Sequence, residues 1–115
     1  MLKFEPGTIV EVVFPFEEGK ASKRRPALVL KDDGDTTFIV AKITSQNKGR
    51  RWDVHIPRNS VNGLSIDSFI QVDKVIKLSK EKVCSLIPRG SIAPLQLAVI
   101  IDKLREFRES KRTRS

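Results

Sequence analysis

Residues 26–44 read PALVLKDDGDTTFIVAKIT, two apolar runs separated by a short acidic segment that contains a glycine. The run at 26–30 is almost continuously apolar, which predicts a strand buried on both faces, with Pro26 at its first position, where a missing N–H does least harm. The DDGD segment at 32–35 is typical of a tight turn, and residues 36–44 form the returning strand. This stretch therefore predicts an antiparallel hairpin.

The expected register of that hairpin brings two polar side chains together. Pairing about a turn centre near Gly34 places residues whose numbers sum to about 69 opposite each other, Arg25 and Thr44 among them. A guanidinium and a hydroxyl would then reach one phosphate. Such a pair suits metal-free RNA cleavage, in which the ribose 2′-OH attacks the adjacent phosphorus and arginine, always charged, bridges two phosphoryl oxygens. The alternative is a cap that merely closes the strand ends.

Short apolar segments on either side of the hairpin predict further strands. They lie at 7–16 and 52–56, with one or two short strands in 67–78 and another apolar segment at 81–87. From Pro94 onward the apolar spacing changes to i, i+3, i+4, which predicts an amphipathic helix over about 94–109. The chain is thus expected to be mainly β, a small β-barrel with a C-terminal α-helix. We expect one domain over 1–110 and a basic tail at 111–115.

Composition narrows the class of protein. The 115 residues include 22 Lys and Arg against 14 Asp and Glu, a net charge of +8 that attracts polyanions or acidic partners. The single cysteine, Cys84, excludes an intramolecular disulfide framework and a multi-cysteine zinc site. No apolar run has the length of a membrane span, and the N-terminus lacks a secretory pattern. A soluble cytoplasmic protein with no membrane partner is therefore expected.

Basic side chains concentrate in two polar loops that each follow a strand. The first cluster lies within residues 20–25 and the second within 48–51. If both loops lie at one mouth of the barrel, they form a groove for a phosphodiester backbone. The alternative is a soluble protein with lysine-rich turns. The candidate RNA-binding residues, with the polar pair that follows Thr44, are Lys20, Lys23, Arg24, Ser45, Gln46, Lys48, Arg50 and Arg51.

Most other catalytic patterns are missing. His55, the only histidine, is expected to point outward from its strand, which is more typical of a surface histidine than of a general base. Cys84 has apolar neighbours and is expected to be a buried, inert thiol. The DDGD segment lacks the full calcium-loop pattern, and no paired-histidine metal motif or glycine-rich phosphate loop occurs. We expect no metal and no cofactor.

Several blocks, in their order and spacing, resemble the MazF/PemK family of toxin ribonucleases from type II toxin–antitoxin systems. The blocks are PGTIV at 6–10 with FPF at 14–16, KRRPALVL at 23–30, AKITSQ at 41–46 and DSFIQVDK at 67–74. The resemblance implies an SH3-like barrel of the MazF/PemK/CcdB type that acts as a homodimer. It also implies a metal-independent, sequence-selective endoribonuclease on single-stranded RNA, which leaves 2′,3′-cyclic phosphate and 5′-hydroxyl ends.

The resemblance also assigns roles to residues. It makes Arg25, in the R-P motif, and Thr44, in the I-T-S-Q motif, the catalytic pair. It implies an antitoxin partner whose flexible acidic segment folds over the RNA groove, which suits a surface of charge +8. Some family members hold a histidine directly before the arginine and an acidic residue in the preceding loop. Here those positions hold Arg24 and Lys20.

Two other functions use some of the same features. A non-catalytic nucleic-acid-binding barrel would use the basic loops but leave Thr44 without a role. A gyrase-directed poison with a similar barrel fits less well, because the chain ends KRTRS at 111–115, with no terminal Trp. Trp52 either stacks on a base or packs at the barrel edge.

Overall fold

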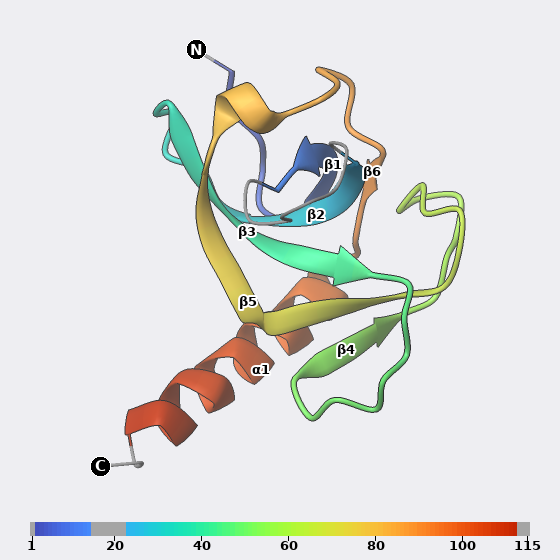
Figure 1. Cartoon of the computed structure of the whole chain (residues 1–115), viewed down its shortest axis with the longest axis vertical. Coiled ribbons are helices and arrows are strands. Elements are labelled where there is room, and N and C mark those ends of the chain that lie inside the picture. Colours follow the sequence, from blue (N-terminus) through green and yellow to red (C-terminus); the bar gives the residue numbers. More distant parts are fainter. Residues whose placement is uncertain (1, 15–22, 113–115) are drawn as a thin grey trace.

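The computed structural model describes residues 2–14 and 23–112. Its elements, in chain order, are β1 (Thr8–Val13), β2 (Arg24–Lys31), β3 (Thr37–Thr44), β4 (Asp53–Ile56), β5 (Ser68–Ser79), the 3₁₀ turn η1 (Lys80–Lys82), β6 (Gly90–Ser91) and α1 (Pro94–Arg112). The six strands form one antiparallel sheet in the order β4-β5-β3-β2-β1-β6. The sheet curls into a half-barrel with α1 below it (Figure 1), which confirms the predicted mainly-β barrel with a C-terminal helix.

The β2–β3 hairpin has the predicted register. Ala27 pairs with Lys42, and the two following pairs, Leu28 with Ala41 and Val29 with Val40, keep the same sum of 69. The register then shifts by one residue, next to the turn. Gly34 adopts a φ of 86° in that turn, a conformation that costs glycine little because it has no Cβ.

Alternate residues of the central strands enter two different apolar clusters, because successive side chains of a strand point to opposite faces. Leu28 belongs to the cluster that also holds Ile100 of α1, whereas Ala27 and Val29 belong to the other. The strand at 26–30 is therefore buried on both faces, as its continuous apolar run predicts. The second cluster consists of Phe4, Val10, Val12, Phe14, Ala27, Val29, Phe38, Val40 and Leu78.

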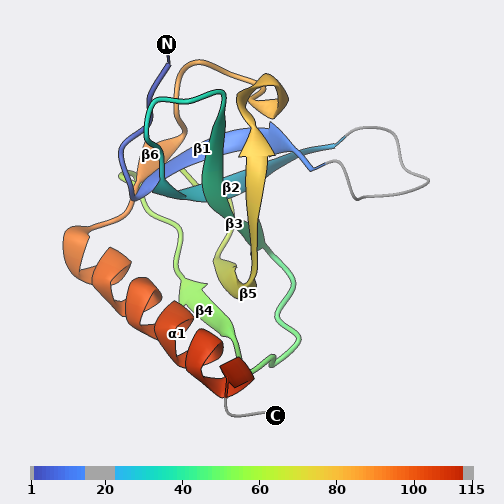
Figure 2. The ribbon, with the colours of Figure 1, turned by 90° about the vertical axis from the view of Figure 1, so that its left-hand side faces the viewer.

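Helix α1 lies below the sheet (Figure 2) and packs against the cluster that holds Leu28. Ile100 and Leu104 are its buried residues, and Leu97 and Phe107 pack partly buried beside them. The helix begins at Pro94, and it continues to Arg112, three residues beyond the end that the apolar spacing indicates. No helix within 2–14 and 23–112 is long and apolar enough to cross a membrane.

Three segments differ from the sequence-based expectations. Residues 67–78 hold one long strand, β5, in which the residue paired with β3 jumps from Val75, opposite Ala41, to Gln71, opposite Lys42. The short strand β6 was not expected, and it pairs with the start of β1. Cys84 is partly exposed, so the prediction of a buried thiol is wrong; the segment around it makes only a single bridge, Val12 to Val83, and does not enter the core as a strand.

Candidate active site

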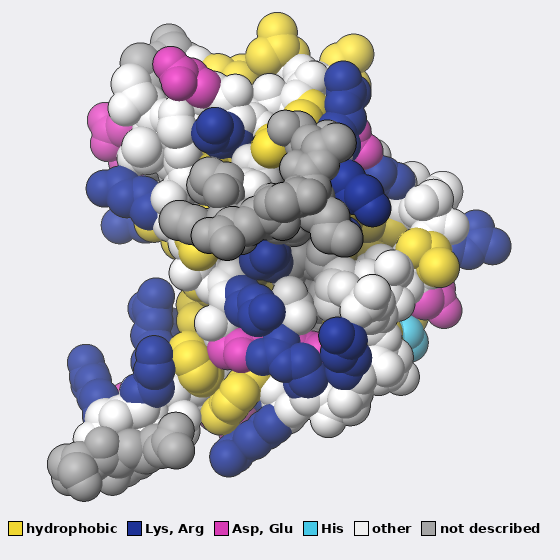
Figure 3. All heavy atoms as spheres, in the orientation of Figure 1, with side chains coloured by type: hydrophobic (Ala, Val, Ile, Leu, Met, Phe, Trp, Pro, Cys, Tyr) yellow, Lys and Arg dark blue, Asp and Glu magenta, His cyan; other side chains and the backbone are white. Residues whose placement is uncertain are grey.

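A polar cavity of ≈ 360 Å³ opens where the end of β3 meets the start of β2. Five of its lining side chains are cationic and one is a carboxylate, so the cavity attracts anions. Figure 3 shows Lys and Arg side chains gathered over the bend of β5, with carboxylates among them. The lining residues are Arg25, Lys42, Ile43, Thr44, Ser45, Gln46, Lys48, Arg50, Asp53, Gln71 and Lys74.

A second cavity of ≈ 120 Å³ adjoins the first and shares four residues with it, among them Arg25 and Thr44. Its other walls come from β2, from β5, from residues 64–66 and from Arg89. The predicted catalytic pair therefore lies on the wall common to both cavities. The hairpin explains this position, because the pairs observed at 27–29 lead on to Arg25 and Thr44 at the strand ends.

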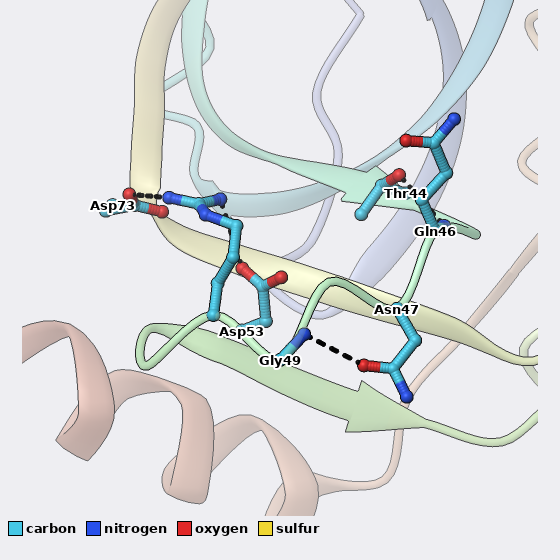
Figure 4. A network of polar contacts seen from close by, with 7 residues as sticks. Thr44, Gln46, Asn47, Gly49, Asp53 and Asp73 are labelled. Carbon is cyan, nitrogen blue, oxygen red and sulfur yellow. Dashed lines mark hydrogen bonds and ion pairs between the residues drawn. The ribbon is translucent and has the colours of Figure 1, made fainter.

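The loop after β3 fixes the position of the Thr44 hydroxyl. Thr44 Oγ1 accepts a hydrogen bond of 3.2 Å from the backbone N–H of Gln46 (Figure 4). Because that bond uses the oxygen as an acceptor, the hydroxyl proton is available for donation to a ligand. Further along, Asn47 Oδ1 accepts a 3.1 Å bond from the N–H of Gly49, which shapes the next turn.

Arg50, expected to be an RNA-binding cation, contacts two carboxylates within the protein. Its guanidinium donates to Asp53 Oδ1 at 3.2 Å and to Asp73 Oδ2. The Asp53 and Asp73 side chains are only 5% and 17% exposed. Burial raises the pKa of Asp53 and the Asp73 charge adds to this, whereas Arg50 and Lys74 oppose it. Arg50 therefore anchors the loop after β3 to β4 and β5.

The other predicted RNA-binding residues lie in different places. Ser45, Gln46 and Lys48 line the first cavity, and Arg24 lines the second. Lys23 is exposed and lines neither. Arg51 also lines neither cavity and lies over the Trp52 ring, with 4.6 Å to its centroid. Lys20 is outside the described residues.

Sequence reasoning missed several lining residues. Lys42 lies inside the apolar strand β3, between Ala41 and Ile43. A charged residue within an apolar run is the sequence feature that could have identified it as a site residue. Asp53 has the same signal on β4, and Lys74 and Gln71 come from β5. Because β4 and β5 are distant in sequence from the hairpin, only their pairing brings them to the cavity.

The remaining candidates lie outside the two cavities. His55 is exposed on β4, with its ring 5.1 Å from that of Phe69. Trp52 packs edge-on against Phe107 of α1 at 5.3 Å, which favours the packing role at the barrel edge. In the described part of the chain, no three His, Cys, Asp or Glu side chains are grouped so that they could hold a metal ion.

Solved structures of similar fold support this architecture. MazF from Deinococcus radiodurans matches with a TM-score of 0.73 and 21% identity, over 91% of this chain and 96% of that one. Toxin MazF-mt6 from Mycobacterium tuberculosis matches with 0.69 and 20%, over 86% and 93%. An endoribonuclease from a mycobacterial species, in complex with its cognate antitoxin, matches with 0.68 and 13%, over 88% and 90%. At these identities the likeness establishes the fold alone.

No curated protein matches the chain by sequence. A family model does: the model described as "PemK-like, MazF-like toxin of type II toxin-antitoxin system" matches residues 5–107, which include both cavities and the whole sheet. The chain therefore belongs to the family of PemK-like, MazF-like toxins of type II toxin–antitoxin systems.

Proposed function

We propose that this toxin is an endoribonuclease that cuts single-stranded RNA by attack of a ribose 2′-OH on the adjacent phosphorus, without a metal ion. One observation carries the proposal: Arg25 and Thr44 lie on the wall shared by two adjoining cavities. A phosphodiester bound at that wall would face the larger cavity on one side and the smaller cavity on the other. The cationic lining of the larger cavity favours such a polyanion.

In the proposed reaction the 2′ oxygen bonds to phosphorus and the bond from phosphorus to the 5′ oxygen breaks. The 2′-OH loses its proton and the departing 5′ oxygen gains one, so the products are a 2′,3′-cyclic phosphate and a 5′-hydroxyl. Arg25 holds the two non-bridging oxygens as negative charge builds on them, and Thr44 donates one further hydrogen bond. By analogy with an oxyanion hole, each such donor contributes about 10²–10³ in rate.

The neighbours of Arg25 suggest how the 2′-OH is activated. Arg24, in the position where some family members hold a histidine, cannot act as a base because a guanidinium stays protonated. We infer that the positive charge of Arg25 and Lys42 favours the developing oxyanion. DNA lacks the 2′-OH and would bind in the cavity without being cut.

We also propose the partners that the resemblance implies, an acidic antitoxin and a second copy of the chain. The cationic cavity supports the first, since an acidic segment laid across it would exclude RNA. The mycobacterial complex and the MazE–MazF structures from Deinococcus radiodurans support it as well. Light scattering of the isolated toxin tests the homodimer, for which it must give twice 13.0 kDa.

The decisive experiment incubates the protein with a long unstructured RNA in EDTA and maps the ends of any fragments. Thr44→Val removes the hydroxyl at nearly constant volume and should lower single-turnover cleavage about 10²–10³-fold, as should Arg25→Gln. Thr44→Ser keeps a hydroxyl and should retain most of the rate. Thr37→Val makes the same change at the other end of β3 and should leave cleavage unchanged.

Each alternative has its own result. Intact RNA that is bound with a steep dependence on salt would indicate a non-catalytic binding barrel. Intact RNA with inhibited gyrase would indicate the gyrase-directed poison. Cleavage that EDTA abolishes would contradict metal independence, and full activity in Thr44→Val would remove the proposed role of the hydroxyl. Circular dichroism of each variant must match that of the wild type for these comparisons to hold.

A further inference from the structure

Cations and aromatic rings alternate on one surface beside the larger cavity. Lys103, Phe107 and Lys111 are spaced i, i+4, i+8 and so share one face of α1. Phe107 meets the Trp52 ring at 5.3 Å. The Trp52 ring centre lies 4.6 Å from the Arg51 guanidinium and 5.4 Å from Lys103 Nζ, and Lys111 Nζ lies 5.1 Å from that of Phe107. We call these five residues the cation–aromatic surface.

The three cations of this surface keep their charge available. Within residues 2–14 and 23–112, Arg51, Lys103 and Lys111 form no ion pair, and each lies over an aromatic ring. Other cations of the same helix differ: Arg105 pairs with Asp102 at 3.3 Å, and Arg112 pairs with Glu109 at 3.9 Å. A ring attracts a cation without neutralising it, so the aromatic contacts hold these charges in place for an external anion.

The cation–aromatic surface is continuous with the larger cavity. Arg51 and Trp52 lie in the chain between Arg50 and Asp53, which both line that cavity. The Trp52 carbonyl accepts a 3.2 Å hydrogen bond from the N–H of Val72 on β5, which holds this corner against the sheet. Figure 2 shows the C-terminal half of α1 beside the start of β4. A strand of RNA that leaves the cavity at this edge would therefore meet the surface at once.

We propose that the cation–aromatic surface binds the backbone of the RNA segment that flanks the cleaved site. The inference rests on the proposed function, because it extends the same RNA beyond the cavity. Lys103 and Lys111 are eight residues apart, about 12 Å along the helix axis, so they would contact separate phosphates. Cations interleaved with aromatic rings are what single-stranded nucleic acids bind, through phosphates and base faces together. The rings among the cations favour RNA over an acidic protein as the occupant, because aromatic side chains bind base faces.

The test compares two double variants of one helix. Lys103→Gln/Lys111→Gln removes two cations of the surface, and Arg105→Gln/Arg112→Gln removes two that are ion-paired, with the same change in net charge. Binding is measured against salt concentration with 2′-O-methyl RNAs of about 5 and about 15 nucleotides, lengths within the range of single-strand sites. These RNAs cannot be cut by 2′-OH attack, so binding is read without cleavage.

For the long RNA, loss of two phosphate contacts should reduce the salt slope of the binding constant by about 1.4. The affinity advantage of the long over the short RNA should fall roughly tenfold in Lys103→Gln/Lys111→Gln. The control double variant should keep the wild-type slope. Equal slopes in the two double variants would overturn the proposal, as would a wild type that binds both lengths equally. Loss of poly-L-glutamate binding with an unchanged RNA slope would assign the surface to an acidic protein instead.

Failure of the proposed function gives a different result. If the wild type leaves RNA uncut in EDTA, the assignment as a metal-independent endoribonuclease fails. The slopes measured with uncleavable RNA still report whether the cation–aromatic surface binds the flanking segment.

Discussion

Arg50, in the loop after β3, and Asp73, on β5, form an ion pair although 23 positions separate them in the sequence. The same guanidinium contacts Asp53, the first residue of β4. Asp73 Oδ1 is buried and has no hydrogen-bond partner in the described part of the chain, so Arg50 is the main compensation for that carboxylate. Arg50, which the sequence predicts to bind RNA, thus stabilises the wall of the cavity instead.

Arg50→Gln should therefore destabilise the protein. It leaves two largely buried carboxylates without their shared cation, which we expect to cost about 1–3 kcal/mol of unfolding free energy, measured by urea denaturation. Asp73→Asn removes one of those charges, so the double variant should lose less than the sum of the single variants. Lys48→Gln, in the same loop but exposed, should change stability by less than about 0.5 kcal/mol. Additive losses would contradict the coupling.

Asp32 is another carboxylate with a structural role. Its oxygens accept hydrogen bonds from the N–H of Phe4 at 2.7 Å, the N–H of Gly34 at 2.8 Å and Lys80 Nζ at 2.8 Å. Burial by itself would raise the pKa of this carboxyl, but the three donors outweigh it and hold the pKa below its ordinary value of 3.8. The contribution to stability is present above that value and is lost as the pH falls through the lower folded-state pKa.

Asp32→Asn should lower stability at neutral pH by about 2–3 kcal/mol, because a charge-assisted acceptor is lost. It should also flatten the decline of stability on acidification below about pH 4, since the variant no longer has this group to protonate. Urea midpoints measured from neutral to acid pH give both quantities. Asp33→Asn is the matched control: the Asp33 side chain is 65% exposed and, among the described residues, pairs only with Lys31, at 3.8 Å. A parallel decline in Asp32→Asn and wild type would contradict the assignment.

The parts of the fold that the sequence predicts are those with local signals. The β2–β3 hairpin has two apolar runs around a turn centred on Gly34, and its register follows from counting. The two-residue strand β6 has no such signal. At Gly90 it lies so close to the loop at 61–62 that a Cβ there would stand 2.1 Å from the Val61 carbonyl oxygen, which leaves space for glycine alone. Only the folded chain shows that contact.

The residues of the candidate site also fall into those that the sequence predicts and those that it does not. The shared position of Arg25 and Thr44 was predictable because both lie on one hairpin. Gln71 and Lys74 were not, since the residue of β5 that pairs with β3 jumps from Val75 to Gln71 at an irregularity that no sequence pattern marks. The sequence pattern also cannot tell a cation that faces solvent from one, such as Arg50, that has a carboxylate partner on a distant strand.

Asn62 is a buried polar residue that stabilises the turn-rich segment between β4 and β5. Its side chain is fully buried, accepts bonds from the N–H of Asn59 at 3.1 Å and Leu64 at 3.0 Å, and donates to the Pro57 carbonyl at 2.9 Å. Asn62→Ala should cost about 2–4 kcal/mol, because several buried backbone groups lose their partner at once. Urea denaturation measures the loss. Asn47→Ala, an exposed turn residue, serves as control, and an equal loss there would contradict the argument.

The pH dependence of cleavage tests how the 2′-OH is activated. No histidine lines either cavity, and His55, on β4, lies against Phe69 of β5. The single-turnover rate should therefore show no inflection of the kind that an imidazole with a pKa of about 6.5 produces between about pH 5 and 8. His55→Gln should keep the wild-type profile. Arg24→His places an imidazole at the wall of the second cavity and should introduce a new inflection in that range. An inflection in the wild type that His55→Gln abolishes would make His55 the base and would contradict electrostatic activation by Arg25 and Lys42.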